Sequence, residues 1–352
     1  MRFYSILAMC PVIFLMAGCT VSPAAKGADI VEKLLESTEQ TTGSGIYQEK
    51  EVSISESDRQ AETTVVRSWN DPVHQKSLYI TSVPDGSVYY TAVNSRYMTM
   101  YKEGSTTAKV LPLPGSYFSR KMPDKEASVA ALENLRETHS IMLKGDTDVK
   151  GKAAYWLSAL PKDHESGHEE QLWISKKKWR ILKTSTASAE LRKKTLIKEE
   201  KEIHSVPMDE FQLPEKINAA TDYDLNWQAK EVSLQSLPNG ILLFEEKNQI
   251  NLFSADKLQS SKEGYRLSYT KDGREYMRLT GEKSAPGLNA ADEGDSNHYV
   301  LGHPVSIYPI PETGILAEWN DGRFQFELII YDPYIPSWRL KELLETIIVK
   351  KG

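Results

Sequence analysis

The feature of this sequence that most limits its fold is a repeated two-residue alternation of apolar and polar side chains. Each run is rich in β-branched and aromatic residues, which pack well on a half-buried sheet. We therefore expect a mainly β, α+β protein. The runs cover residues 46–55, 63–69, 77–83, 87–101, 148–160, 171–175, 179–185 and 191–200, and then 250–255, 265–270, 275–281, 299–308, 315–319 and 324–331.

Turn signals separate several of these runs. Asp-Gly pairs end at Gly86, Gly273 and Gly322 and predict tight hairpin connections. Asn94-Ser95 divides the long run 87–101 into two strands. The strands are therefore expected to form antiparallel meanders.

Three stretches have helical periodicity instead. Residues 29–39 place four apolar side chains on one stripe, with Asp29 as the expected N-cap. Residues 125–143 form a second amphipathic stretch, and residues 336–348 a third, with Ser337 as its expected N-cap.

The first residues have the pattern of a secretory signal. Arg2 precedes an apolar run from Ile6 to Ala17, which is shorter than the roughly 20 residues that a membrane-spanning helix needs. Met16-Ala17-Gly18-Cys19 resembles the lipobox of bacterial lipoproteins, which implies a diacylglyceryl Cys19 carrying acyl chains such as palmitate. The alternative is an ordinary signal peptide with a chance Cys. We assign residues 1–18 to the signal and 19–28 to a lipidated Cys and flexible tether.

The cysteines and the charge exclude several classes of function. The chain has two Cys, of which Cys10 would leave with the signal and Cys19 would be acylated, so no thiol remains for catalysis, a disulfide or a metal. Removal of one of the 43 basic residues leaves 42 against 49 acidic ones, a net charge of −7. An acidic chain attracts no phosphate backbone, so no nucleic acid is expected as a partner.

His164-Glu165-Ser166-Gly167-His168 matches the H-E-x-x-H pattern of zinc peptidases. A zinc helix needs helix formers between its two His, whereas Ser and Gly stand there, and no apolar periodicity runs through 161–170. We interpret the segment as a polar hairpin loop without a third ligand. No P-loop, Rossmann glycine set or G-x-S-x-G is present. We expect no metal, no cofactor, no catalytic residues and no enzyme activity.

The strand meander, the internal helical stretch, the pair of runs around LWISKKKWRILKTST and the closing PMDEFQLP together resemble the LolA/LolB/RseB-like, lipoprotein-sorting-type bacterial proteins, including sporulation-associated lipoproteins of Bacillus. The resemblance covers residues 29–216. It implies an open, curved antiparallel half-barrel with covering helices and an apolar concave face. Residues 222–352 are similar to a smaller antiparallel β domain with a terminal helix that follows such domains.

An apolar concave face would be a ligand cavity, and the aromatic and Met residues of the strands are its candidates. Alternation allows only one of Tyr89 and Tyr90, and one of Met100 and Tyr101, to point inward. The same side chains can equally fill a core. The cavity candidates are Tyr89, Tyr97, Met98, Met100, Tyr101, Trp156 and Trp173.

Together these interpretations predict a lipoprotein held to the extracytoplasmic face of the cell membrane through Cys19. Its function is expected to be binding of an acyl chain or apolar ligand in the concave sheet, linked to sporulation or envelope maintenance. The alternative is a signalling or structural role through contacts with a protein, such as a membrane protein. An open cavity would favour the first, and a packed interior with exposed apolar side chains the second.

Overall fold

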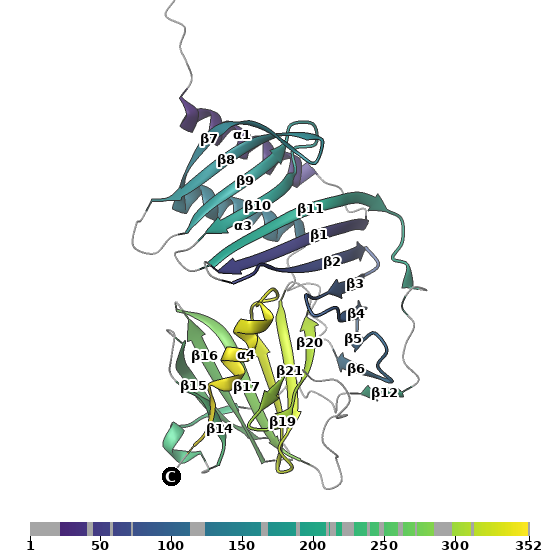
Figure 1. The fold of residues 1–352 in the computed structure, drawn as a ribbon, viewed down its shortest axis with the longest axis vertical. Helices are drawn as coiled ribbons and strands as arrows, with labels where there is room; N and C mark the ends of the chain where they lie inside the picture. The colour runs from purple at the N-terminus through teal and green to yellow at the C-terminus, as the bar shows by residue number, and fades with distance from the viewer. Residues whose placement is uncertain are drawn as a thin grey trace, which may run out of the picture.

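A computed structural model shows the fold of the chain (Figure 1). It describes residues 22–40, 45–56, 59–71, 73–112, 124–162, 168–187, 191–208, 211, 216–219, 229–237, 240–245, 250–259, 263–271, 273–284, 298–310 and 313–350. The expected signal and Cys19 lie outside these residues.

The first half of the chain forms one 12-stranded sheet with the order β12-β6-β5-β4-β3-β2-β1-β11-β10-β9-β8-β7. All neighbours pair antiparallel except β12 and β6, which are parallel. Its ends do not meet, so the sheet is open, as expected. The strands are β1 (Gly45–Glu56), β2 (Glu62–Asp71), β3 (Lys76–Ser82), β4 (Val88–Val93), β5 (Tyr97–Lys102), β6 (Thr107–Pro112), β7 (His139–Val149), β8 (Lys152–Pro161), β9 (Glu169–Ser175), β10 (Ile181–Ala187), β11 (Leu191–Ile203) and β12 (Lys216–Ala219).

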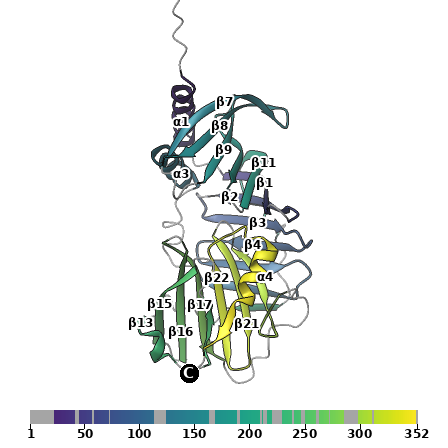
Figure 2. The same ribbon diagram turned by 60° about the vertical axis from the view of Figure 1, so that its left-hand side comes forward.

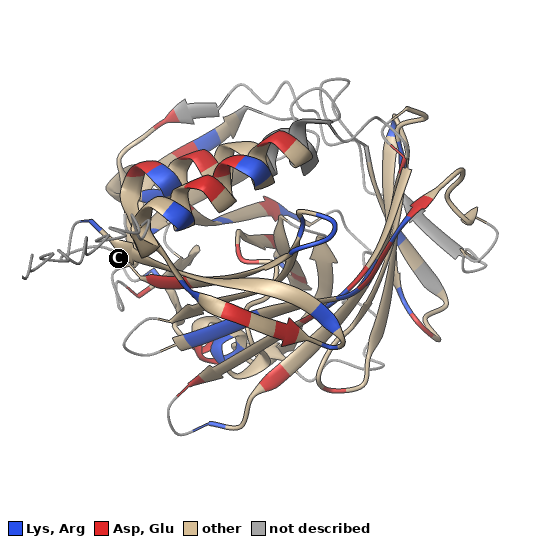
Figure 3. Cartoon of the chain, turned by 90° about the horizontal axis from the view of Figure 1, so that it is seen from above, with Lys and Arg blue, Asp and Glu red and all other residues tan. Residues whose placement is uncertain are grey.

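Two helices, α1 (Pro23–Gln40) and α3 (Asp124–Thr138), pack on β7–β9. Seen from above, the sheet curves around the side that carries them (Figure 3), and we call this side the concave face. Val31 and Leu34 of α1 and Leu132 of α3 meet Leu157 and Ile174 of the strands in one buried cluster. The helices thus cover one end of the sheet with aliphatic side chains, which removes apolar surface from water.

Helix α1 begins at Pro23 instead of Asp29, so most of the expected tether is helical. The amide of Ala25 donates to Ser22 Oγ at 3.2 Å, and Pro23 occupies the first turn. A Ser followed by Pro is a favoured helix start, because Ser caps a free amide and Pro has none to leave unpaired. The prediction overlooked this signal.

The second helical stretch also differs from its prediction. Helix α3 ends at Thr138, and β7 begins at His139 within the range 125–143. Residues 139–143 pair with the end of β8, from Leu157 to Pro161. The expected strand 148–160 is divided by a tight turn at Lys150 and Gly151, where φ is 50° and 79°. In both places, pairing with a neighbouring strand overrides local propensity.

The second half forms a smaller domain around a seven-stranded sheet, order β13-β15-β16-β17-β22-β21-β20, with helix α4 (Ser337–Glu345) on one face. This confirms the expected second β domain with a helix near its end. The strands are β13 (Ala229–Glu231), β14 (Leu242–Phe244), β15 (Ile250–Gln259), β16 (Glu263–Lys271), β17 (Arg274–Lys283), β18 (Tyr299–Val300), β19 (His303–Pro304), β20 (Ser306–Ile310), β21 (Gly314–Asn320), β22 (Phe324–Ile330) and β23 (Ile347–Val349); η2 (Leu234–Ser236) is a short 3₁₀ helix.

Two predictions in this domain are wrong in detail. The run 299–308 is divided among β18, β19 and β20, because Leu301 and Gly302 make a turn with φ of 50° and 88°. The terminal helix stops at Glu345, and Ile347–Val349 pairs with β14 as β23. The expected hairpin glycines are confirmed, since Gly86, Gly273 and Gly322 all have φ between 74° and 87°.

Candidate functional site

The pairing register assigns the strand residues of the first sheet to its two faces. Residues opposite each other in an antiparallel ladder point to the same side. Leu157 and Leu172 pair on the helix-covered face. From Leu172, paired residues carry this face across the sheet to β5, with a step of two residues along β1 and along β4. In order, the residues on this face are Leu172, Thr184, Thr195, Val52, Lys50, Val66, Thr81, Tyr89, Thr91 and Met100.

At the β3–β6 end, the concave face is covered by the second domain. Met98 and Met100 are only 3% and 1% exposed, and they share a buried cluster with Ile310 of β20 and Leu316 of β21. Figure 2 shows the second domain beside β3 and β4. The other members of this contact are Val66, Tyr79, Val93, Leu111, Tyr308, Ile329 and Tyr334.

A buried group of charges lies at the edge of the same contact. Lys109 Nζ on β6 is 2.5 Å from Glu318 Oε1 and 3.7 Å from Glu327 Oε1, and the two Glu are directly opposite each other on β21 and β22. Burial lowers the pKa of Lys109, but the two carboxylates raise it by more. Burial raises the pKa of Glu327 against the opposing effect of Lys109. The lysine thus holds together two acids that would otherwise repel.

Polar contacts between α4 and the segment from Arg59 to Glu62 form the rim of the contact between the two domains. The Ser337 amide and hydroxyl both donate to the Glu62 carboxylate, at 2.7 and 2.5 Å. The guanidinium of Arg59 contacts Glu342 and lies 4.2 Å from the ring centroid of Trp338. Ser337 is therefore not the N-cap that the sequence predicts. Pro336 is the capping residue, and Glu62 of the other domain accepts a hydrogen bond from the first amide of the helix.

The structure divides the seven cavity candidates between the two faces. Met98, Met100 and Tyr89 are on the concave face, as the alternation rule allows. Burial, together with nearby Asp85, raises the pKa of Tyr89 to about 12. The remaining four, Tyr97, Tyr101, Trp156 and Trp173, are on the outer face.

On that outer face, Tyr97 is 47% exposed, and Tyr101 stacks on Tyr90 and contacts Phe211. Trp156 and Trp173 stack on each other at 6.2 Å. These four side chains therefore do not line a common cavity with the Met pair. Whether any of the seven binds a ligand stays a prediction.

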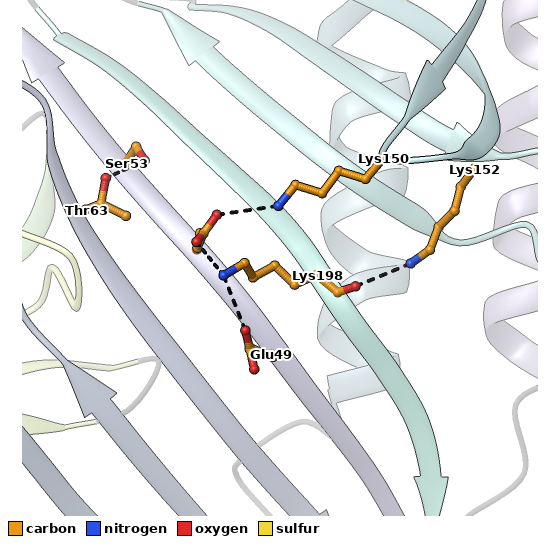
Figure 4. A network of polar contacts seen from close by, with 7 residues as sticks. Glu49, Ser53, Thr63, Lys150, Lys152 and Lys198 are labelled. Carbon is orange, nitrogen blue, oxygen red and sulfur yellow. Dashed lines mark hydrogen bonds and ion pairs between the residues drawn. The ribbon is translucent and has the colours of Figure 1, made fainter.

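The outer face also carries an exposed ion network (Figure 4). Lys198 of β11 bridges Glu49 and Glu51 of β1 at 3.5 and 2.6 Å, and Lys150 approaches Glu51 at 3.9 Å. Lys152 Nζ donates to the Lys198 carbonyl. The network ties the β7–β8 turn to the middle of the sheet, and its exposure makes it worth little energy.

The H-E-x-x-H match lies between two strands that pair directly. Ala159 of β8 pairs with Glu170 of β9 in an antiparallel ladder. His164 to Gly167 lie outside the described residues, and the carbonyl of His168 lies 3.1 Å from Nε2 of His139. Among the described residues, no group of three or more His, Cys, Asp or Glu is placed to hold a metal. Within the same residues, no helix is long and apolar enough to cross a membrane.

A pocket of about 260 Å³ opens in the second domain. Sequence reasoning missed it, because its residues come from four separate segments that only the tertiary fold brings together. The Asn320-Asp-Gly322 turn signal placed one of those segments without indicating a pocket. The lining residues are Gly240, Leu242, Val300, Leu301, His303, Trp319, Asp321, Arg323 and Val349.

No family model and no curated protein matches the chain. Solved structures to which it is similar include the Pseudomonas aeruginosa MucA/MucB complex, with a TM-score of 0.35, 12% identity and coverage of 93% of this chain and 100% of that one. LprF from Mycobacterium bovis has a TM-score of 0.36, 12% identity and coverage of 53% and 98%. A LolA superfamily protein from Nitrosomonas europaea has a TM-score of 0.24, 10% identity and coverage of 53% and 97%.

These similarities include the LolA group that the sequence resembles. At such identities and TM-scores, they support no argument about what the chain binds. None of the three proteins bears on a link to Bacillus sporulation lipoproteins, which stays a prediction.

Proposed function

We propose that this chain is a non-enzymatic binding protein on the extracytoplasmic face of a cell membrane, which recognises a partner protein through its second domain. The observation that carries the proposal is the burial of Met98 and Met100 beneath Ile310 and Leu316. A lipid-binding half-barrel needs an accessible apolar face, and here the protein's own second domain occupies that end. An apolar guest would have to displace it.

The anchor fits this arrangement. If Cys19 is acylated, only two residues stand between it and Ser22, the first residue of the described body. Such a link spans about 10 Å at most. The α1 end would therefore sit near the lipid, and two or more acyl chains would hold it there. The second domain lies at the opposite end of the long axis (Figure 1), where a partner away from the membrane surface can reach it.

The second domain also presents large apolar side chains to water. Phe253 is 74% exposed at a bulge in β15, and Tyr299 and Leu301 are 59% and 53% exposed in the β18–β19 hairpin. A bulge re-aims its side chain, here Phe253. Leu301 also lines the pocket of this domain, and exposed apolar surface, where it is contiguous, marks protein contact sites. A role in envelope maintenance or sporulation, with a membrane protein as one candidate partner, belongs to this proposal.

The test is site-specific photocrosslinking of the full chain in the bacterium that encodes it. A photoreactive phenylalanine analogue replaces Phe253 or Tyr299, and Lys177, exposed in the β9–β10 turn of the first domain, is the matched control. We expect a protein adduct of one defined mass at the two second-domain positions and none at 177. Identical products at all three positions, or none at any, would contradict the proposal.

A second candidate function is binding of an acyl chain or other apolar ligand between the sheet and the second domain. Two adjacent Met side chains favour it, because Met adapts to varied apolar guests. Native mass spectrometry of residues 20–352, purified without detergent, distinguishes the two. A co-purifying lipid that Met100→Glu removes from a still folded protein would support the ligand function, whereas an apo mass without fatty-acid uptake would exclude it.

A further inference from the structure

The pocket of the second domain combines an apolar rim with a small volume. Leu301 and Val349 line it while remaining 53% and 43% exposed, and buried Leu242 and Val300 continue the apolar lining. Its 260 Å³ lie below the roughly 300–1,000 Å³ of pockets that hold drug-sized ligands. The space therefore suits one apolar side chain or a short alkyl chain.

A cation also lines this pocket. Arg323 is exposed, and its guanidinium makes no ion pair with a described residue. Asp321, the acid that lines the same pocket, has its Oδ1 engaged by the backbone amides of Arg323 and Phe324 at 2.8 and 2.7 Å. Its carboxylate thus holds the hairpin turn, and the Arg323 side chain remains available for another anion.

These groups suit a carboxylate that carries an apolar group. Arg presents a planar fork that matches a carboxylate with two hydrogen bonds. We propose that the pocket binds the free carboxyl end of a polypeptide whose last residue is apolar, with the side chain against Leu301 and Val349 and the carboxylate at Arg323. The inference rests on the proposed function and adds the chemistry of the partner. A short fatty acid shares this chemistry, and the test separates the two.

The experiment measures fluorescence anisotropy of a labelled Gly-Gly-Ser-Leu peptide with residues 20–352. We expect saturable binding of the free acid and about tenfold or weaker binding of the C-terminal amide, because a charge-assisted bond is lost. Arg323→Gln should weaken binding of the free-acid peptide by a similar factor and leave binding of the amide peptide unchanged. Leu301→Ser should weaken binding of both peptides. Arg274→Gln, at the exposed β16–β17 turn, is the matched control and should change neither.

Equal binding of acid and amide, or no binding of either, would overturn the inference. Binding of hexanoate without binding of the peptide would overturn the assignment to a polypeptide. Circular dichroism and thermal unfolding of each variant show that the fold is kept. If the peptide fails while crosslinked adducts still form at Phe253 or Tyr299, the proposed function stands and only this pocket's assignment is lost.

Discussion

The two ends of the concave face are covered in different ways. At the β7–β9 end, α1 and α3 contribute an entirely apolar cluster that includes Leu34 and Leu157. At the β3–β6 end, the second domain contributes Ile310 and Leu316, and a buried Lys109 bridges two acids beside them.

The two covering elements differ in whether they have a hydrophobic core of their own. The helices have no other core, so removing them would expose the strands beneath. The second domain has its own cluster on the other face of its sheet, where Trp319, Phe326 and Leu340 are buried. It can therefore stay folded when the contact is lost. The charges beside that contact carry a cost in desolvation, which their mutual attraction offsets.

The largest effect is expected from breaking the charge group. Lys109→Ala leaves Glu318 and Glu327 buried and unpaired, which costs about 3–5 kcal/mol. We expect the domains to separate and unfold in two transitions, measured by calorimetry and limited proteolysis. Lys76→Ala, at the exposed start of β3, is the control and should keep the wild-type profile. A single transition for Lys109→Ala would show that the domains cannot fold apart.

A cavity under the helices should have a different signature. Leu34→Ala removes a side chain that is 2% exposed and should cost about 2–5 kcal/mol in urea unfolding. The loss should fall on the first domain alone, without separating it from the second. Glu36→Ala, on the exposed side of the same helix, should change stability by less than about 0.5 kcal/mol. A similar loss in both variants would argue against the helix packing.

The pH dependence of the domain contact should follow Glu327. The pKa of Glu327 is raised in the folded protein. The stability that this carboxyl contributes to folding is therefore fully present below its ordinary pKa of 4.5, and it is lost as the pH rises through the folded pKa. Glu327→Gln should therefore be neutral or about 1 kcal/mol more stable at pH 7.5, and the gain should vanish at pH 4.5. Urea unfolding at both values measures it. Glu318→Gln, which removes the closer partner of Lys109, should instead destabilise the protein at pH 7.5.

The smallest effect is expected at the rim. Glu62→Gln keeps an acceptor for Ser337 but removes the negative charge at the start of α4, a loss of about 0.3–1 kcal/mol. The loss should shrink in 1 M salt, because partly exposed charges are screened. Thermal unfolding at two salt concentrations measures it. An unchanged loss in high salt would assign the effect to hydrogen-bond geometry.

The sequence was informative where a local rule decides the structure. Two-residue alternation predicts β1 to β5 and β15 to β17, because a half-buried strand needs it. Asp-Gly pairs predict turns, because glycine adopts positive φ without strain. The resemblance to LolA-type proteins implied the open sheet. The divisions at His139 and Ile347 were missed, because an apolar stretch of a few residues fits either a helix or a strand.

The sequence by itself determined the fold class and the alternation that turns Met100 and Tyr101 to opposite faces, whereas the lipid anchor at Cys19 stays a prediction. It could not decide which face is covered, or by what. Met98 and Met100 look the same as cavity lining or as core, and only the docking of β20 and β21 buries them. The pocket at Trp319 and Arg323 is likewise a product of tertiary structure, because its residues come from segments far apart in the chain. Such contacts depend on how whole sheets pack, and no short-range pattern records that.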